Sequence, residues 1–134
     1  MLSWHKLVIL IAVSALNIGC SSSEPRAQLK LLAESRANLL STQLPLEYGP
    51  LSIMSAQSHG AIIELIFIYN ETSEGAKPTK IVLYNSLHAY CNSPDTKNNL
   101  DLGISYRIKV RNSRGQLIAD ELITKQRCNG IASS

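Results

Sequence analysis

The N-terminal segment determines which part of this chain belongs to the folded domain. It has the layout of a secretory signal, because Lys6 precedes a short apolar run that ends in Gly19 and Cys20. The run is too short for a membrane span, which needs about 20 apolar residues. Since the run ends at a cysteine and a serine-rich tether follows, we interpret residues 1–19 as a lipoprotein signal peptide and Cys20 as the residue whose thiol is acylated.

Asn17 departs from the usual lipoprotein signal, and Ser21 indicates the membrane to which the protein is sorted. Asn17 lies three positions before Cys20, where bacterial lipoprotein signals usually carry leucine, so we expect less efficient processing rather than loss of export. Ser21 follows the cysteine, and the absence of an aspartate there points to the outer membrane. Residues 20–25 are then a flexible tether, and residues 26–134 are long enough for a single domain.

The cysteine count and the charge narrow the function classes. Besides Cys20 the chain has Cys91 and Cys128, and two cysteines in an exported protein most simply form a disulfide. A metal site would need further nearby ligands, and a catalytic thiol would need an activating partner; the sequence indicates neither. The formal charge is +3 without a contiguous basic run, which argues against nucleic-acid binding.

Helical spacing of apolar residues predicts three helices. The first covers residues 26–42 and stops before Pro45, and its apolar stripe includes Leu39. The second covers residues 79–90. A short third helix starts at the Ser-Pro pair of residues 93–94 and ends before Gly103.

Two hairpins supply the strands. Residues 51–56, a turn over residues 58–60 and residues 61–69 form the first, and residues 104–110 and 116–124 form the second. Strand 61–69 is apolar on both faces, so each face needs a cover: helices for one, and either more of the domain or a bound partner for the other. We therefore expect an α+β fold, with an antiparallel sheet of four or five strands, three or four flanking helices and one disulfide.

Residues suited to catalysis are few. His59 and His88 have no neighbouring nucleophile or carboxylate pattern, so both are interpreted as solvated or structural. Glu64 in an apolar strand could be an acid of raised pKa, but without a partner we favour a position at the rim of the sheet. A basic stripe is interpreted as a solvated sheet face that discourages edge pairing: Arg107, Lys109 and Arg111. The sequence thus predicts a binding domain, not an enzyme, with no metal and no cofactor.

Four segments in order along the chain carry a resemblance to a known family: Leu51–Gly60, Tyr90-Cys91 with Pro94 close behind, Gly103–Arg111 and Arg127–Gly130. Together with the signal they resemble the disulfide-containing class of type II secretion pilotins, which are small outer-membrane lipoproteins. The resemblance implies a sheet flanked by helices and a Cys91–Cys128 bond. It also implies that the protein captures the C-terminal helix of the secretin subunit and carries it to the outer membrane, where the secretin pore assembles.

The resemblance sets the remaining expectations. A lipid on Cys20 (palmitate among its acyl chains) would hold a monomeric domain on the periplasmic face of the outer membrane. An amphipathic secretin helix would need an apolar groove. Candidate lining residues are Ile62, Ile66, Leu83 and Leu87, with burial in the core as the alternative for each. Two other functions stay open: a periplasmic inhibitor or immunity lipoprotein that binds an enzyme through loop 70–78, and an enzyme that uses Glu64 or His88.

Overall fold

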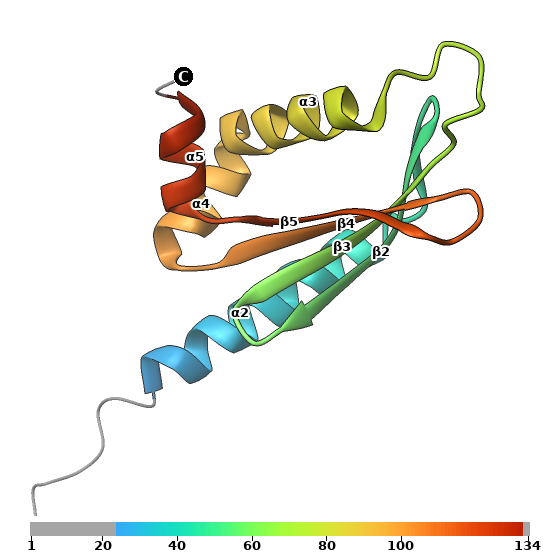
Figure 1. Ribbon diagram of the computed structural model, residues 1–134. Helices are drawn as coiled ribbons and strands as arrows, with labels where there is room; N and C mark the ends of the chain where they lie inside the picture. Colours follow the sequence, from blue (N-terminus) through green and yellow to red (C-terminus); the bar gives the residue numbers. More distant parts are fainter. Residues whose placement is uncertain (1–23, 133–134) are drawn as a thin grey trace, which may run out of the picture.

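The computed structural model describes residues 24–132, in which helices cover one face of a five-stranded sheet. Its elements are α2 (Glu24–Ser41), β1 (Leu46–Tyr48), β2 (Leu51–His59), β3 (Ile62–Tyr69), α3 (Thr79–Asn92), α4 (Pro94–Leu102), β4 (Ser105–Asn112), β5 (Leu117–Ile123) and α5 (Lys125–Ala132). Figure 1 shows α3, α4 and α5 gathered over β4 and β5, while α2 runs along β2 and β3. Over this range none of the helices has the length and apolarity that a membrane crossing requires. The signal peptide and Cys20 lie outside the described residues.

The sheet confirms the predicted α+β class and strand number, but it is mixed and not wholly antiparallel. The strands lie in the order β1-β2-β3-β4-β5, and every neighbouring pair is antiparallel except β3 and β4, which are parallel. The reason is the connection between them: α3 and α4 form a crossover that returns the chain to the end of the sheet where β3 began. The β2–β3 hairpin and the β4–β5 hairpin are therefore joined into one sheet by the parallel pair of β3 and β4.

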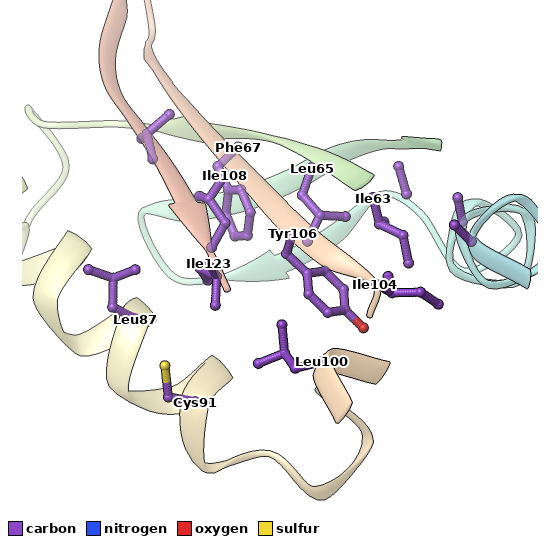
Figure 2. Packing of buried hydrophobic residues seen from close by; sticks show 14 of the residues in the cluster. Ile63, Leu65, Phe67, Leu87, Cys91, Leu100, Ile104, Tyr106, Ile108 and Ile123 are labelled. Atoms are coloured by element: carbon purple, nitrogen blue, oxygen red, sulfur yellow. The ribbon is translucent and has the colours of Figure 1, made fainter. Parts of the chain in front are cut away.

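The core lies between β3 and β4 and the helices. Ile63, Leu65 and Phe67 are at most 3% exposed. The alternation predicted for β4 is confirmed, since Tyr106 and Ile108 are also buried, at 4% and 0%. In the register of the parallel pair Ile63 lies opposite Tyr106, so both strands place these residues on one face. Figure 2 shows Leu87 and Leu100 reaching from α3 and α4 toward this face.

Helix α2 packs on β2 and β3 through small side chains. It begins at Glu24, two residues before the predicted start, with Pro25 in the first turn, where no intrahelical N–H bond is lost. Ala33 and Ala37 are fully buried, which brings the helix close to the sheet. The prediction that Leu39 belongs to the apolar stripe was wrong, because Leu39 is 59% exposed. The buried face of α2 contains Ala33 and Ala37, and at the end of the helix the next residue, Leu40, lies on that face.

Helices α3 and α4 have nearly the predicted bounds. Gly103 ends α4 with a φ of +102°, and the N–H of the next residue, Ile104, bonds to the carbonyl of Asn99. A Cβ on Gly103 would lie 3.2 Å from the Leu29 side chain of α2. This glycine therefore serves both the left-handed turn and the contact between the end of α4 and α2.

Three local features differ from the sequence prediction. Strand β2 continues to His59, which pairs with Ile62, so the hairpin turn lies at Gly60 and Ala61, not at residues 58–60. Strand β1 has only three residues, too few for a periodic signal. Helix α5 was not predicted because its helical propensity is weak; the Thr124 hydroxyl oxygen accepts a bond from the Arg127 N–H at its start.

Candidate functional site

The disulfide is where the sequence placed it. Cys91 near the end of α3 and Cys128 in α5 are bonded, with their Cα atoms 5.3 Å apart. The bond closes a loop of 37 positions, which the chain-entropy model values at about 4 kcal/mol. It joins two helices of the group over β4 and β5, so it stabilises that group instead of forming a reactive centre.

A cavity of about 320 Å³ lies beside the disulfide and is lined in part by His88 and an ion pair between Lys125 and Asp101. The His88 ring contacts Tyr84 at 4.4 Å between centroids, and its buried Nε2 has no hydrogen-bond partner among the described residues. His88 is thus partly enclosed, and no nucleophile or carboxylate is paired with it there. Within residues 24–132 no group of three histidine, cysteine, aspartate or glutamate side chains is arranged to hold a metal ion.

The four residues predicted to line a partner groove do not meet on one surface. Ile62 and Ile66 point to the face of the sheet that no described helix covers, and both are partly exposed. Leu83 is partly buried against the core, and Leu87, at 5% exposure, belongs to it (Figure 2). Successive side chains of a strand point to opposite faces. Ile62 and Ile66 of β3 therefore point away from the face that α3 covers, where Leu83 and Leu87 lie. A role of these residues in partner binding stays a prediction.

The uncovered sheet face combines apolar and charged side chains. Besides Ile62 and Ile66 it presents Ile68 of β3, together with Met54 and Leu122, which are 46% and 47% exposed. We call this surface the open sheet face. The apolar pattern of β3 predicted that both faces of the strand would need a cover. The open sheet face is the second of these faces, and no described part of the chain covers it.

Most charged groups on the open sheet face are paired with one another, whereas the Arg111 guanidinium donates to the Gly115 carbonyl. Glu64 Oε2 lies 2.8 Å from Lys109 Nζ, and the Arg107 guanidinium donates two bonds of 2.8 and 2.7 Å to Asp120. The bonds from Arg107 hold the pKa of Asp120 below its usual value. The solvated face predicted for the basic stripe is confirmed, but Glu64 is not at the rim and the stripe protects no edge, because β3 and β4 are interior strands.

A groove separates α3 from the segment that contains the end of α2 and β1. Two cavities of about 450 and 340 Å³ follow one another along it, and Ala89 lines both. The α3 residues along it share one helical stripe: Val82, Asn85, Ser86, Ala89, Tyr90 and, just past the helix end, Ser93. We call this feature the α2–α3 groove.

The far side and the floor of the groove are largely apolar and aromatic. Leu39 of α2 and Tyr48 of β1 stand on the far side and are 59% and 61% exposed. On the floor Asn99 donates a bond of 2.6 Å to the Tyr106 hydroxyl, which satisfies the buried amide. Burial raises the pKa values of Tyr90 and Tyr106, so both phenols are neutral near pH 7 and add no charge to the groove.

Sequence reasoning missed the α2–α3 groove. A signal was present in α3, where Ser86, Ala89 and Ser93 are small side chains at helical spacing, although a helix packed on a sheet would usually place larger apolar ones there. The other signal was Leu39, which was assigned to the core. The residues that Leu39 contacts depend on the angle at which α2 crosses the sheet, and this angle is set by tertiary packing.

A protein-family comparison gives a match that covers most of the domain. Residues 25–128 match the family described as "Type II secretion system (T2SS) pilotin, S protein". A curated relative, "Pilotin AspS 2" from Escherichia coli O78:H11, is 27% identical over 106 residues, which cover 79% of this chain and 76% of the relative.

Solved structures of two Vibrio proteins have the same fold. The type II secretion system pilotin AspS from Vibrio cholerae is 51% identical, with a TM-score of 0.74 over 79% of this chain and 97% of that one. The pilotin EpsS from the Vibrio vulnificus type 2 secretion system is 48% identical, with a TM-score of 0.75 over 80% of this chain and 97% of that one. The likeness therefore spans nearly the whole of both solved domains.

Proposed function

Because the chain belongs to the type II secretion system pilotin family, we propose that it binds the C-terminal segment of the secretin subunit and targets that subunit to the outer membrane for pore assembly. The observation that carries the proposal is the match of residues 25–128 to the pilotin family, together with the fold that this chain shares with both Vibrio pilotins. The protein is then an accessory factor and not an enzyme.

The N-terminal sequence supplies the second half of the proposed mechanism. If Cys20 is acylated, with palmitate among its chains, lipid sorting carries the domain to the periplasmic face of the outer membrane and the bound secretin subunit travels with it. A lipoprotein with several acyl chains stays attached, whereas a single chain gives only marginal binding. Recognition by the folded domain and transport by the anchor are thus separable.

Deletion of the gene tests the proposal in cells. We expect the secretin to remain unassembled or in the inner membrane, as measured by membrane fractionation and by the heat-resistant multimer band on a gel. Normal multimers in the outer membrane of the deletion strain would exclude the pilotin role.

Purified components test the recognition step. The domain without its signal should co-purify with a peptide from the secretin C-terminus, and a scrambled peptide is the control. Replacement of Cys20 by serine should leave this binding intact and abolish outer-membrane targeting of the secretin. Targeting that survives C20S would show that the anchor is incidental.

A further inference from the structure

Helix α2 begins close in sequence to the residue that is expected to carry the lipid. Only residues 21–23 separate Cys20 from Glu24, where α2 starts. Even a fully extended chain covers at most about 3.6 Å per residue, so the step from Cys20 to Glu24 spans no more than about 14 Å. If Cys20 is acylated, the start of α2 therefore lies close to the bilayer surface. This short reach restricts which part of the domain can face the lipid.

The start of α2 belongs to one end of the sheet. The Leu29 side chain lies beside Gly103, where a Cβ atom would be 3.2 Å away. The Ser105 N–H donates a bond of 3.0 Å to the Ala61 carbonyl, so β4 begins beside the β2–β3 turn, and β5 ends there because it is antiparallel to β4. Figure 1 shows the start of α2 and the α4–β4 connection on the same side of the molecule. We call the residues of this end the anchor end: 24–30, 59–62, 101–105 and 123–125.

The anchor end exposes apolar side chains. Leu102, the last residue of α4, is 56% exposed, and it directly precedes the glycine that contacts α2. Ala61 and Ile62 of the first hairpin are partly exposed as well. A single exposed leucine is common on protein surfaces and indicates nothing by itself. Here a lipid on Cys20 would hold this leucine within reach of a bilayer, in which an apolar side chain is removed from water.

Basic side chains outnumber acidic ones at the anchor end. Its charged residues are Arg26, Lys30 and Lys125 on one side and Glu24 and Asp101 on the other. Lys125 is paired with Asp101 at 2.7 Å, whereas Arg26 and Lys30 are exposed and form no ion pair within residues 24–132. Two cations are therefore available to lipid phosphates, with their aliphatic stems along the bilayer boundary.

The anchor changes how strong a contact with the bilayer has to be. A free domain loses translational and rotational freedom when it binds a surface, and one leucine with two cations does not compensate for that loss. A domain that is already held by acyl chains makes the same contact within one molecule, at a high effective concentration. A contact too weak to recruit the domain is therefore sufficient to orient it.

We propose that the anchor end is a membrane-contact surface, which rests on the phospholipid of the outer membrane with Leu102 inserted at the boundary between headgroups and acyl chains. This inference depends on the proposed function, because it requires the lipid on Cys20. It points the opposite end of the domain, with Tyr48 and loop 70–78, away from the bilayer and into the periplasm.

Tryptophan fluorescence tests this orientation without interference from native tryptophan. The chain has one tryptophan, Trp4, which lies in the signal peptide. L102W therefore gives the processed lipoprotein a single reporter at the anchor end. Y48W is the matched control at the opposite end, where Tyr48 is 61% exposed, and L31W reports the outer side of α2, where Leu31 is 65% exposed. Thermal unfolding verifies that each variant is folded.

The full-length lipoprotein is reconstituted into vesicles of phosphatidylethanolamine and phosphatidylglycerol, with or without brominated acyl chains that quench tryptophan on contact. We expect brominated lipid to remove at least about half of the L102W emission but less than about a tenth of the Y48W and L31W emission, because only an inserted side chain reaches the acyl chains. Tryptophan itself favours the interface, but all three variants share this preference, so it does not produce the difference.

Flotation of the vesicles separates this inference from the proposed function. A wild-type lipoprotein that does not float with the vesicles would overturn the anchor, and the proposed targeting with it. A lipoprotein that floats but is quenched equally at positions 102 and 48, or at neither, would overturn the membrane contact while targeting stands, and would leave Leu102 to a protein neighbour. Stronger quenching at position 31 would also overturn it, since α2 would then lie on its outer side.

The basic residues provide a second readout. In the L102W background, R26E/K30E should lower the quenching at least about twofold, because anionic headgroups repel the reversed charges. K80E/R114E is the matched control, since Lys80 at the start of α3 and Arg114 in the β4–β5 turn are exposed and lie outside the anchor end. An equal reduction by both pairs would contradict a contact made by the anchor end.

Discussion

The two faces of the sheet are formed by the same strands but differ in how deeply their side chains are buried. On the helix-covered face, Ile63 and Ile108 are completely buried. On the open sheet face the neighbouring residues Ile62 and Ile66 stay partly exposed, beside the ion pair of Glu64 and Lys109. The covered face carries the stability of the domain, since buried apolar area is the main favourable term in folding. The open face tolerates its apolar residues because charged pairs interrupt them.

The largest difference between the faces should appear in stability. Ile108→Ala leaves a cavity in the core and should lower the free energy of unfolding by about 2–5 kcal/mol. Ile66→Ala removes a partly exposed side chain and should cost about 1 kcal/mol. Urea unfolding of both variants measures the difference. Equal losses would mean that the open face is as well packed as the core.

The disulfide should come next in magnitude, because it holds the helices over the covered face. Replacement of Cys91 and Cys128 by serine should lower the free energy of unfolding by about 2–4 kcal/mol. Urea unfolding of the double variant, compared with the oxidised wild type, measures the loss. An unchanged unfolding midpoint would show that the contacts between α3 and α5 hold these helices without the bond.

The glycine that ends α4 should have a smaller effect. Gly103→Ala requires a side chain at a φ of +102° and 3.2 Å from Leu29, which should cost about 1–2 kcal/mol. Gly130 is the matched control: it lies in α5 without a positive φ and with open space around its Cβ position, so G130A should be neutral or stabilising. Thermal unfolding of both variants tests the pair. Equal effects would remove the conformational explanation.

The smallest effect should belong to the open face and should depend on pH. Bonds from Arg107 lower the pKa of Asp120 in the folded state, so this pair stabilises the fold above the unfolded pKa of about 3.9 and loses its effect as pH falls through the folded pKa. The carboxyl signal of Asp120 should titrate below that value in an NMR titration. R107Q should move the midpoint upward, and an unmoved midpoint would rule out Arg107 as the cause.

Local patterns predicted most of the elements. The alternation of Tyr106 and Ile108 defined β4, and the proline and glycine at its ends defined α4. Periodicity failed where an element is short, as in β1, or has weak propensity, as in α5. It also placed the proposed partner residues on the correct elements but not on one surface, because the assignment of a strand face to the core needs the position of the helices.

The sequence by itself determined the cysteine pair, the α+β class and the two-faced apolar pattern of β3. These follow from residue chemistry and from spacing along a few neighbouring positions, which local sterics and hydrophobicity control. The tertiary structure alone decided that β3 and β4 run parallel, that all described helices share one face, and that a groove remains between α2 and α3. Those features depend on how distant segments pack against each other, and the spacing of residues within one segment carries no record of it.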